Sequence, residues 1–282
     1  RQGWRWPPAR ASLRHELTTP SSRRVRTPRG FGALGVIAAL FLALPVVGLV
    51  IRAPWSAVAD RLSRPGVGDA LQLSALCATA STVAAMVLGI PLGWLLANDR
   101  LPGRSLLRAV VLVPLLLPPL VSGIGLLSVL GRRGMAGKWL DRWFGFTLPF
   151  STAGVIVAVT FVALPFVVIT MESGFRSIDR RLLGAAATLG AAPGPVTRTV
   201  TLPLVAPSLA ASAALAWARS LGEFGATVTF AGNLPGRTQT LPLATFLALE
   251  TDLDQAILLS MLLLGPTVVV LALLRNRWRP SL

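Results

Sequence analysis

The sequence is poor in the side chains that most catalytic and metal sites use. Its 282 residues include one cysteine, Cys77, and one histidine, His15, which lies in a polar N-terminal stretch. One cysteine excludes an intrachain disulfide and a cysteine-based metal cluster, and one histidine in such a stretch leaves no material for Ser–His–Asp or Cys–His catalysis. The residues therefore predict no metal site and no catalytic residue in this chain.

Charged residues are scarce as well. They make up 13% of the chain, whereas an ordinary soluble domain has about 25%, so the composition argues against a soluble globular protein and against disorder of the whole chain. A phosphate-binding Gly-x-x-x-x-Gly-Lys-Ser/Thr loop is also absent, because the only lysine, Lys138, is followed by Trp139. The chain therefore cannot hydrolyse ATP by that mechanism, and energy for an active process would come from another subunit.

Hydrophobic residues make up 53% of the chain, and they form long uncharged runs. The six runs are Gly30–Ile51, Ala70–Asn98, Ala109–Gly131, Trp143–Met171, Thr199–Ala218 and Gln255–Leu274. A helix of about 20 residues crosses roughly 30 Å of hydrocarbon, and a backbone in lipid must satisfy its own hydrogen bonds. The sequence therefore predicts an all-α fold, a polytopic transmembrane bundle with a span for each run.

The predicted plan has a membrane domain at 30–275 between two polar tails. Its spans lie at about 31–51, 71–97, 106–130, 151–171, 204–230 and 255–274. We expect a cytoplasmic loop at 172–202 and an external loop at 231–254. The first tail, 1–29, is rich in Arg, Pro and Ser, so we expect it to be disordered, and the second tail covers 276–282.

The basic residues predict the orientation of the spans. Of the 27 Lys and Arg residues, 18 fall in the two tails and in the second and fourth loops, and 8 fall in the other loops. The positive-inside rule then places both termini in the cytoplasm, which agrees with an even number of spans. Because the net charge of +16 follows the tails and loops, a lipid bilayer explains it, and nucleic acid is not expected as a partner.

The predicted cytoplasmic loop contains an alanine-rich stretch followed by glycine and prolines. Ala185–Ala187 and Leu189 favour a short helix. Gly190 is a typical helix stop, and Pro193 and Pro195 predict a turn. A helix with such small side chains allows close approach of another protein. An ordinary amphipathic helix at the membrane surface is the alternative.

This loop resembles the EAA loop of bacterial ABC importer permeases, in which Glu-Ala-Ala and a glycine precede Leu-Pro and a further proline. The matching residues are Ala185, Ala186, Gly190, Leu202, Pro203 and Pro207. Gly184 stands where the family has its acidic residue, and Leu189 and Ala191 flank the glycine. In that family the loop forms the coupling helix that docks on the ATP-binding subunit, so the resemblance implies an ATPase-coupling role for this whole set.

The fifth predicted span holds two charges, Arg219 and Glu223. Their i, i+4 spacing places them on one helix face, where they can pair, and a charge inside a membrane is costly unless it finds such a partner. One interpretation is a structural ion pair that fixes helix packing. The other is a face that lines a translocation path, with glycines that permit a bend and polar groups that bind an oxyanion. The neighbours that complete this path are Gly222, Gly225, Thr227, Thr229 and Asn233.

The run from Ala218 to Pro242 resembles the molybdate branch of the ABC permeases. It has the order Ala-Arg-Ser-Leu-Gly-Glu-Phe-Gly-Ala-Thr, followed by Phe-x-Gly-Asn-x-Pro-Gly-x-Thr-x-Thr-Leu-Pro. The similarity covers roughly residues 70–275 and includes Ser74–Ala97. It implies a type I ABC importer permease fold and molybdate import through the bacterial cytoplasmic (inner) membrane by alternating access.

The same resemblance implies the partners. Two copies of the chain would surround one path, with a dimer of ABC ATP-binding subunits and a periplasmic or extracellular molybdate-binding protein. ATP and Mg would be used by the partner ATPase, and no cofactor would be bound by this chain. Substrate selectivity would then lie mainly in the binding protein.

The third predicted span contains three prolines, Pro114, Pro118 and Pro119. Proline removes a backbone donor and kinks a helix. The kink is either static or a hinge for the switch between inward-facing and outward-facing states.

Other functions stay open at this point. Within the class, the alternatives are a sulfate, thiosulfate or tungstate permease. From other classes, a secondary transporter or a channel remains, although a secondary transporter usually has ionisable residues in several spans and inverted repeats. A membrane enzyme would need clustered catalytic residues, which the sequence does not show.

Overall fold

The computed structural model describes residues 29–275 and divides the chain into two units. The first unit ends at Gly48 and the second begins at Leu49. The predicted tails, 1–29 and 276–282, lie outside the described residues apart from Arg29, where helix α1 (Arg29–Arg52) begins. α1 is strongly apolar, with a mean hydropathy of 2.8 over its span.

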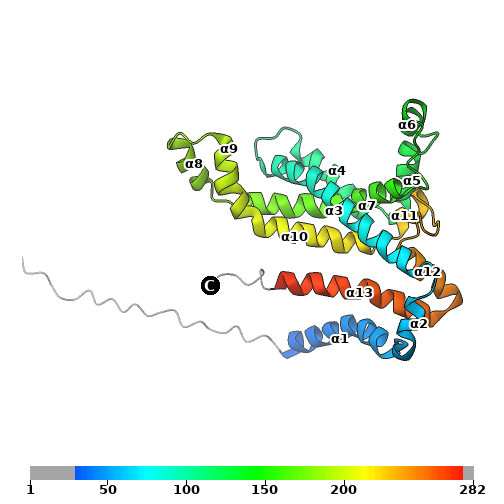
Figure 1. Ribbon diagram of the computed structural model, residues 1–282. Helices are drawn as coiled ribbons and strands as arrows, with labels where there is room; N and C mark the ends of the chain where they lie inside the picture. Colours follow the sequence, from blue (N-terminus) through cyan, green and yellow to red (C-terminus); the bar gives the residue numbers. More distant parts are fainter. Residues whose placement is uncertain (1–28, 276–282) are drawn as a thin grey trace, which may run out of the picture. The chain divides into compact units, whose positions relative to one another are not determined.

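The regular elements that follow α1 are also helical (Figure 1). They are η1 (Trp55–Ala57), α2 (Val58–Leu62), α3 (Val67–Ala97), α4 (Arg104–Leu116), α5 (Pro119–Leu130), α6 (Gly137–Phe144), α7 (Thr152–Arg176), α8 (Arg180–Thr188), α9 (Pro193–Val196), η2 (Thr197–Thr201), α10 (Leu202–Leu221), α11 (Gly225–Phe230), α12 (Leu241–Thr251) and α13 (Leu253–Arg275). Within the described residues, five helices are long and apolar enough to cross a membrane, and α4 with α5 would make a sixth crossing. The predicted all-α transmembrane bundle of about six spans is confirmed.

The core of the second unit is formed by α3, α7 and α10, which pack side by side (Figure 1). Small residues allow this close packing, as is usual between helices in lipid. A Cβ at Gly89 of α3 would lie 2.7 Å from Val167 Cγ1, and a Cβ at Gly93 would lie 2.9 Å from Met171 Cβ. Ser151 caps the N-terminus of α7, because its hydroxyl accepts a 3.1 Å hydrogen bond from the Gly154 amide.

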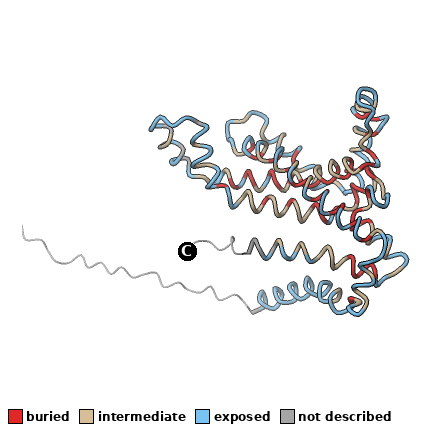
Figure 2. The backbone as a smooth tube through the Cα atoms, viewed as in Figure 1, coloured by how far each residue is buried: buried red, intermediate tan, exposed pale blue. Residues whose placement is uncertain are grey.

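Burial follows this three-helix core, while the outward faces remain exposed (Figure 2). Leu76, Val83 and Val87 of α3 are each more than half exposed. Exposed apolar faces of this extent mark contact with lipid or with another protein. The second unit therefore has a compact interior and an outer surface suited to a bilayer or a further subunit.

The third predicted span is two helices rather than one kinked helix. α4 ends at Leu116 and α5 begins at Pro119, and the two are bent by 116°. Leu117 is extended between them because it precedes Pro118, and the residue before proline is pushed out of the helical region. Pro119 then starts α5, a position where its missing N–H costs nothing. Pro114 lies inside α4.

The fifth predicted span, 204–230, is also interrupted. α10 ends at Leu221, Gly222 is not helical, and α11 begins at Gly225. The external loop expected at 231–254 contains the helix α12, which has Pro242 in its first turn. α12 has 11 residues, too few to cross a membrane, so a search for long apolar runs does not find it.

Candidate functional site

The two predicted charges of the fifth span form an ion pair at the α10–α11 break. Arg219 Nη2 lies 2.6 Å from Glu223 Oε2. The Glu223 side chain is 1% exposed, whereas 28% of the Arg219 side chain is exposed. Glu223 Oε1 also accepts a 2.8 Å hydrogen bond from the Ala226 amide at the start of α11. Glu223 thus joins the end of α10 to the first turn of α11, and part of the Arg219 side chain remains exposed.

The two glycines of this stretch have different roles. A Cβ at Gly225 would lie 2.7 Å from Pro119 Cβ and 3.2 Å from the Leu120 amide nitrogen, so α11 and α5 touch there through backbone. A Cβ at Gly222 would meet nothing within 4 Å. Gly225 therefore permits close packing, and Gly222 only marks the end of α10.

The α10–α11 break and the α4–α5 break meet at this contact. Pro119, predicted as part of a hinge, lies against Gly225, predicted as part of a path. The sequence treats them as separate features because they are far apart in the chain. The structure makes them two sides of one junction, in which both spans are interrupted at the same place.

The three polar residues predicted to bind an oxyanion differ in their surroundings. Thr229 Oγ1 donates to the Gly225 carbonyl at 2.9 Å. Thr227 is fully buried, and its hydroxyl has no hydrogen-bond partner among the described residues. The Asn233 Oδ1 atom is likewise buried without a partner in the described part of the chain. The structure therefore does not place the three side chains on one open face, and their proposed role with an anion stays a prediction.

The predicted coupling loop forms α8, a tight turn, α9 and η2, at the opposite end of the second unit from α11 and α12 (Figure 1). Gly184, Ala185 and Ala186 lie on α8, although the side chain of Ala185 is outside the described residues. Gly190 has a φ of 74°, and the Ala191 amide donates to the Ala186 carbonyl at 3.1 Å. This left-handed glycine ends the helix as the sequence predicts.

The turn predicted at Pro193 and Pro195 is wrong in its position. The chain turns at Leu189–Ala192, and Pro193 is the first residue of α9. Proline fits a helix start because its φ is already helical and its missing N–H would have no partner there. Pro203 likewise lies in the first turn of α10, and Pro207 lies inside α10.

Sequence reasoning missed a charge cluster at the α8 end of the bundle. Glu172 of α7 is buried, and its Oε1 accepts hydrogen bonds from Arg104 at 3.2 Å, from Arg176 at 3.1 Å and from Arg108. Asp99 pairs with Arg104 and with Arg176, each at 3.0 Å. The signal for this cluster was the i, i+4 spacing of Glu172 and Arg176, whereas its contacts with α4 depend on the fold.

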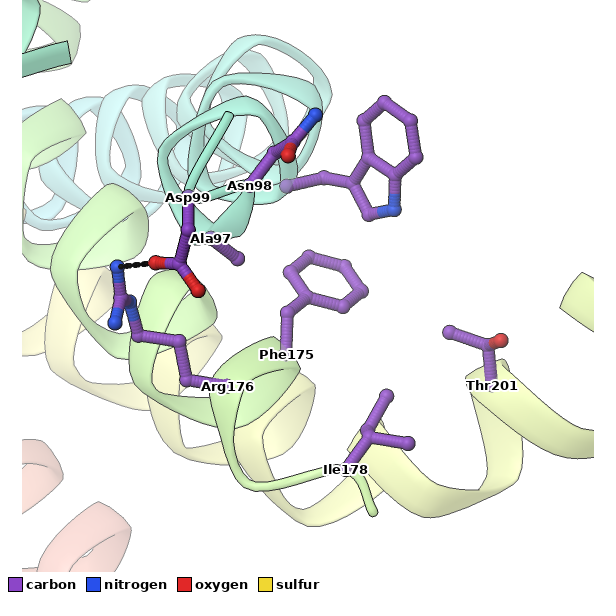
Figure 3. Close-up of a pocket in the computed structure, with 8 residues that line it drawn as sticks. Ala97, Asn98, Asp99, Phe175, Arg176, Ile178 and Thr201 are labelled. Carbon is purple, nitrogen blue, oxygen red and sulfur yellow. Dashed lines mark hydrogen bonds and ion pairs between the residues drawn. The ribbon is translucent and has the colours of Figure 1, made fainter. Parts of the chain in front are cut away.

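A cavity of about 370 Å³ lies beside this cluster. In Figure 3, Asp99 and Arg176 point toward one another, and the Phe175 ring lies next to them. Thr201 of η2 forms part of the lining, so this cavity reaches the predicted coupling loop. The charge cluster and the predicted coupling loop are therefore neighbours.

A second charge cluster lies at the other end, between α2 and the α12–α13 corner. Asp252 accepts hydrogen bonds from Arg61 at 2.9 Å and from Arg64 at 2.8 Å, and Arg61 also contacts Asp254 at 3.1 Å. The hydrogen bond from Arg64 is the main reason that the pKa of Asp252 lies well below its usual value, and the Gln255 amide and Arg61 act in the same direction. These contacts tie α2 and the turn after it to the α12–α13 corner.

The fold, with its two interrupted spans, defines a polytopic helical membrane protein. Residues 89–279 match the model of the family described as "Binding-protein-dependent transport system inner membrane component". The chain belongs to this family. It is accordingly an inner-membrane transport component, not an enzyme, and it works with a binding protein.

Individual relatives agree with this assignment. The molybdenum transport system permease protein ModB of Mycobacterium tuberculosis is 45% identical over 248 residues, which cover 87% of this chain and 91% of that protein. ModB of Escherichia coli K12 is 37% identical, covering 74% of this chain and 92% of its own length. The sulfate transport system permease protein CysT of Escherichia coli K12 is 33% identical, covering 89% and 92%.

Solved structures show the same fold. A bacterial ABC transporter involved in the import of the acidic polysaccharide alginate matches with a TM-score of 0.65 at 16% identity, covering 87% of this chain and 91% of that chain. The MetNI methionine ABC transporter in an inward-facing conformation matches with a TM-score of 0.58 at 20% identity, covering 74% and 95%. At such identities the likeness concerns the fold alone.

Proposed function

We propose that this chain is the permease subunit of an ATP-driven importer that carries molybdate across the cytoplasmic membrane by alternating access. The proposal depends above all on the 45% identity to a permease named for molybdenum transport, over 87% of this chain. The sulfate permease is 33% identical over a similar share, so sulfate or thiosulfate is the second candidate. Tungstate, which has nearly the size and charge of molybdate, is a further candidate.

The proposed path passes the junction of α5, α10 and α11. Arg219 supports this assignment, because 28% of its side chain remains exposed while its counter-ion Glu223 is almost fully enclosed. An anion that passes this point would meet the exposed part of the Arg219 guanidinium, while the ion pair with the buried Glu223 holds that side chain in position. Thr229 and Asn233 lie further along the same stretch and would contribute polar groups.

The proposed coupling surface is the α8–α9 segment. Leu182 is 49% exposed and Leu189 is 86% exposed, and the Cβ positions of Gly184 and Gly190 are open. Exposed leucines among small residues suit docking into a cleft of an ATPase. In this proposal two copies of the chain surround the path, and an ATPase dimer that uses ATP and Mg binds the α8–α9 ends. This chain binds neither.

The proposed orientation places α8, α9 and both termini in the cytoplasm. Loops and tails on that side carry 18 of the 27 basic residues, in agreement with the positive-inside rule. α2, α6, α11 and α12 then lie on the outer side, where the binding protein would deliver its anion.

Uptake of radiolabelled molybdate at nanomolar concentration tests the proposal. Cells with and without this chain are compared, with its partner subunits present in both and with excess unlabelled sulfate as competitor. Chain-dependent uptake that resists sulfate is the expected result. Uptake abolished by sulfate would move the chain to the sulfate branch, and absence of chain-dependent uptake would refute molybdate as the substrate.

A further inference from the structure

Positive charge exceeds negative charge in the cluster around Glu172. Three arginines, Arg104, Arg108 and Arg176, share the two carboxylates of Glu172 and Asp99. All three contact the same oxygen of Glu172, Oε1. One carboxylate oxygen cannot satisfy three guanidinium groups, each of which carries five N–H donors. The cluster therefore has donors and charge left over.

The excess of guanidinium donors and of positive charge is greatest on α4. Arg108 keeps 48% of its side chain exposed, and it contacts Glu172 through one terminal nitrogen, Nη2. Arg104 is 22% exposed, and its buried Nε has no hydrogen-bond partner among the described residues. A buried donor without an acceptor is costly. Both side chains thus have capacity for one further anionic acceptor.

A cavity lies where such an acceptor would bind. It has a volume of about 590 Å³, is open to the outside, and is lined by the turn at Leu101–Gly103 and by α4. Arg104, Ser105 and Arg108 contribute its polar lining, together with Asp99. α4 has 13 residues and begins at Arg104, so the positive end of its dipole faces the same space. Ala109 and Leu112 form an apolar wall along α4.

We propose that this cavity binds a tetrahedral oxyanion group on the cytoplasmic side of the membrane, held by Arg104 and Arg108 with the Ser105 hydroxyl. Two sources supply that chemistry. One is a free oxyanion that has passed through the transporter, a case that rests on the proposed function. The other is the phosphate of an anionic lipid, whose chains would follow the apolar wall, and this case does not depend on the transported substrate.

The experiment uses the full chain assembled with its ATPase in nanodiscs, without the binding protein. In the first arm the nanodiscs contain only phosphatidylcholine, and binding of radiolabelled molybdate is measured by equilibrium dialysis. In the second arm they contain phosphatidylglycerol and phosphatidylcholine, and retained phosphatidylglycerol is counted by native mass spectrometry. Each arm compares the wild type with Arg108→Gln and with the control Arg198→Gln. The control removes the same charge from η2, at the same end.

Arg108→Gln is expected to weaken binding at least about tenfold in one of the two arms, because it removes a charge-assisted donor, while Arg198→Gln leaves binding unchanged. Glu172→Gln is expected to act in the opposite direction and to strengthen binding in the same arm, because it removes the competing carboxylate. A cluster with only a structural role would lose stability in both variants without any gain in anion binding. Equal binding by the wild type and Arg108→Gln in both arms would overturn the proposal. Loss confined to the lipid arm would assign the site to lipid and leave the uptake proposal untouched.

Discussion

Gly123 of α5 and Thr229 of α11 approach so closely that a Cβ at Gly123 would lie 1.7 Å from Thr229 Oγ1. The same Cβ would lie 2.8 Å from the Ala226 carbonyl oxygen. The two interrupted spans therefore meet backbone to backbone at their junction, along the contact that also contains Gly225 and Pro119.

Gly123→Ala is expected to destabilise the transporter by about 1–3 kcal/mol, the usual cost of overpacking. Rotation of Thr229 cannot relieve the clash, since the Ala226 carbonyl is also too close. The thermal unfolding midpoint in detergent measures the effect. Gly125→Ala on the same helix is the matched control, because a Cβ there meets nothing within 4 Å. Equal midpoints for the two variants would contradict the close packing.

Glu223→Gln is expected to lower stability more than it changes anion preference. The glutamine keeps an acceptor for the Ala226 amide but removes the charge that pairs with Arg219. The loss should be about 1–3 kcal/mol, below that of a fully buried pair, because Arg219 retains access to solvent. Thermal unfolding and competition between molybdate and sulfate uptake are measured together. Intact assembly with altered anion preference would show instead that Glu223 itself lines the path.

Gly190→Trp is expected to uncouple ATP hydrolysis from transport while leaving the spans folded. The residue is exposed at the turn after α8, with a φ of 74° and open space at its Cβ, so the bulk acts on a docked partner and not on the bundle. Gly190→Asn is the control for backbone strain, because asparagine tolerates the left-handed conformation. ATPase activity stimulated by the loaded binding protein is the readout. Normal stimulation in the tryptophan variant would argue against docking at this turn.

Asp252→Asn is expected to lower the thermal midpoint at neutral pH by releasing Arg61 and Arg64. These arginines lower the pKa of Asp252 in the folded protein below its value in the unfolded chain. The ionised carboxylate of Asp252 therefore stabilises the fold fully at a pH above the pKa of the unfolded chain. This stabilisation declines as the pH falls toward the pKa of the folded protein. The difference between wild type and variant should therefore shrink from about pH 5 to about pH 3. The neighbouring, exposed Glu250 supplies the control variant Glu250→Gln. A difference that stays constant over this range would contradict the ionic contact.

Local features of this protein were predictable from the sequence, and contacts between distant segments were not. The i, i+4 spacing predicts the Arg219–Glu223 ion pair. The helix stop at Gly190 is predictable because the residue after a helix often adopts a left-handed conformation, which glycine favours. The contact between Pro119 and Gly225 joins residues that no local pattern relates. The length of the apolar runs shows which segments can cross the membrane, but not which ones touch.

The interrupted spans show a second limit of the sequence. Proline predicts a kink, but the size of the bend depends on whether a neighbour fills the space that the bend opens. At Pro118 the bend is 116°, and α11 packs against the start of α5 through Gly225. α12 was missed because an apolar helix of 11 residues has the composition of a span without its length.

The break between α4 and α5 has a consequence for hydration. Pro118 and Pro119 have no amide hydrogen, so the carbonyls of Pro114 and Leu115 lose the donors that a continuous helix would supply. α4, with 13 residues, rises only about 20 Å, less than the roughly 30 Å of the hydrocarbon core, so these carbonyls lie within the depth of the membrane. Lipid offers them no donor. Water or a protein donor must therefore hydrogen-bond to these carbonyls. Where water does so, an ion that passes the break keeps part of its hydration shell inside the membrane, where losing that shell costs the most free energy.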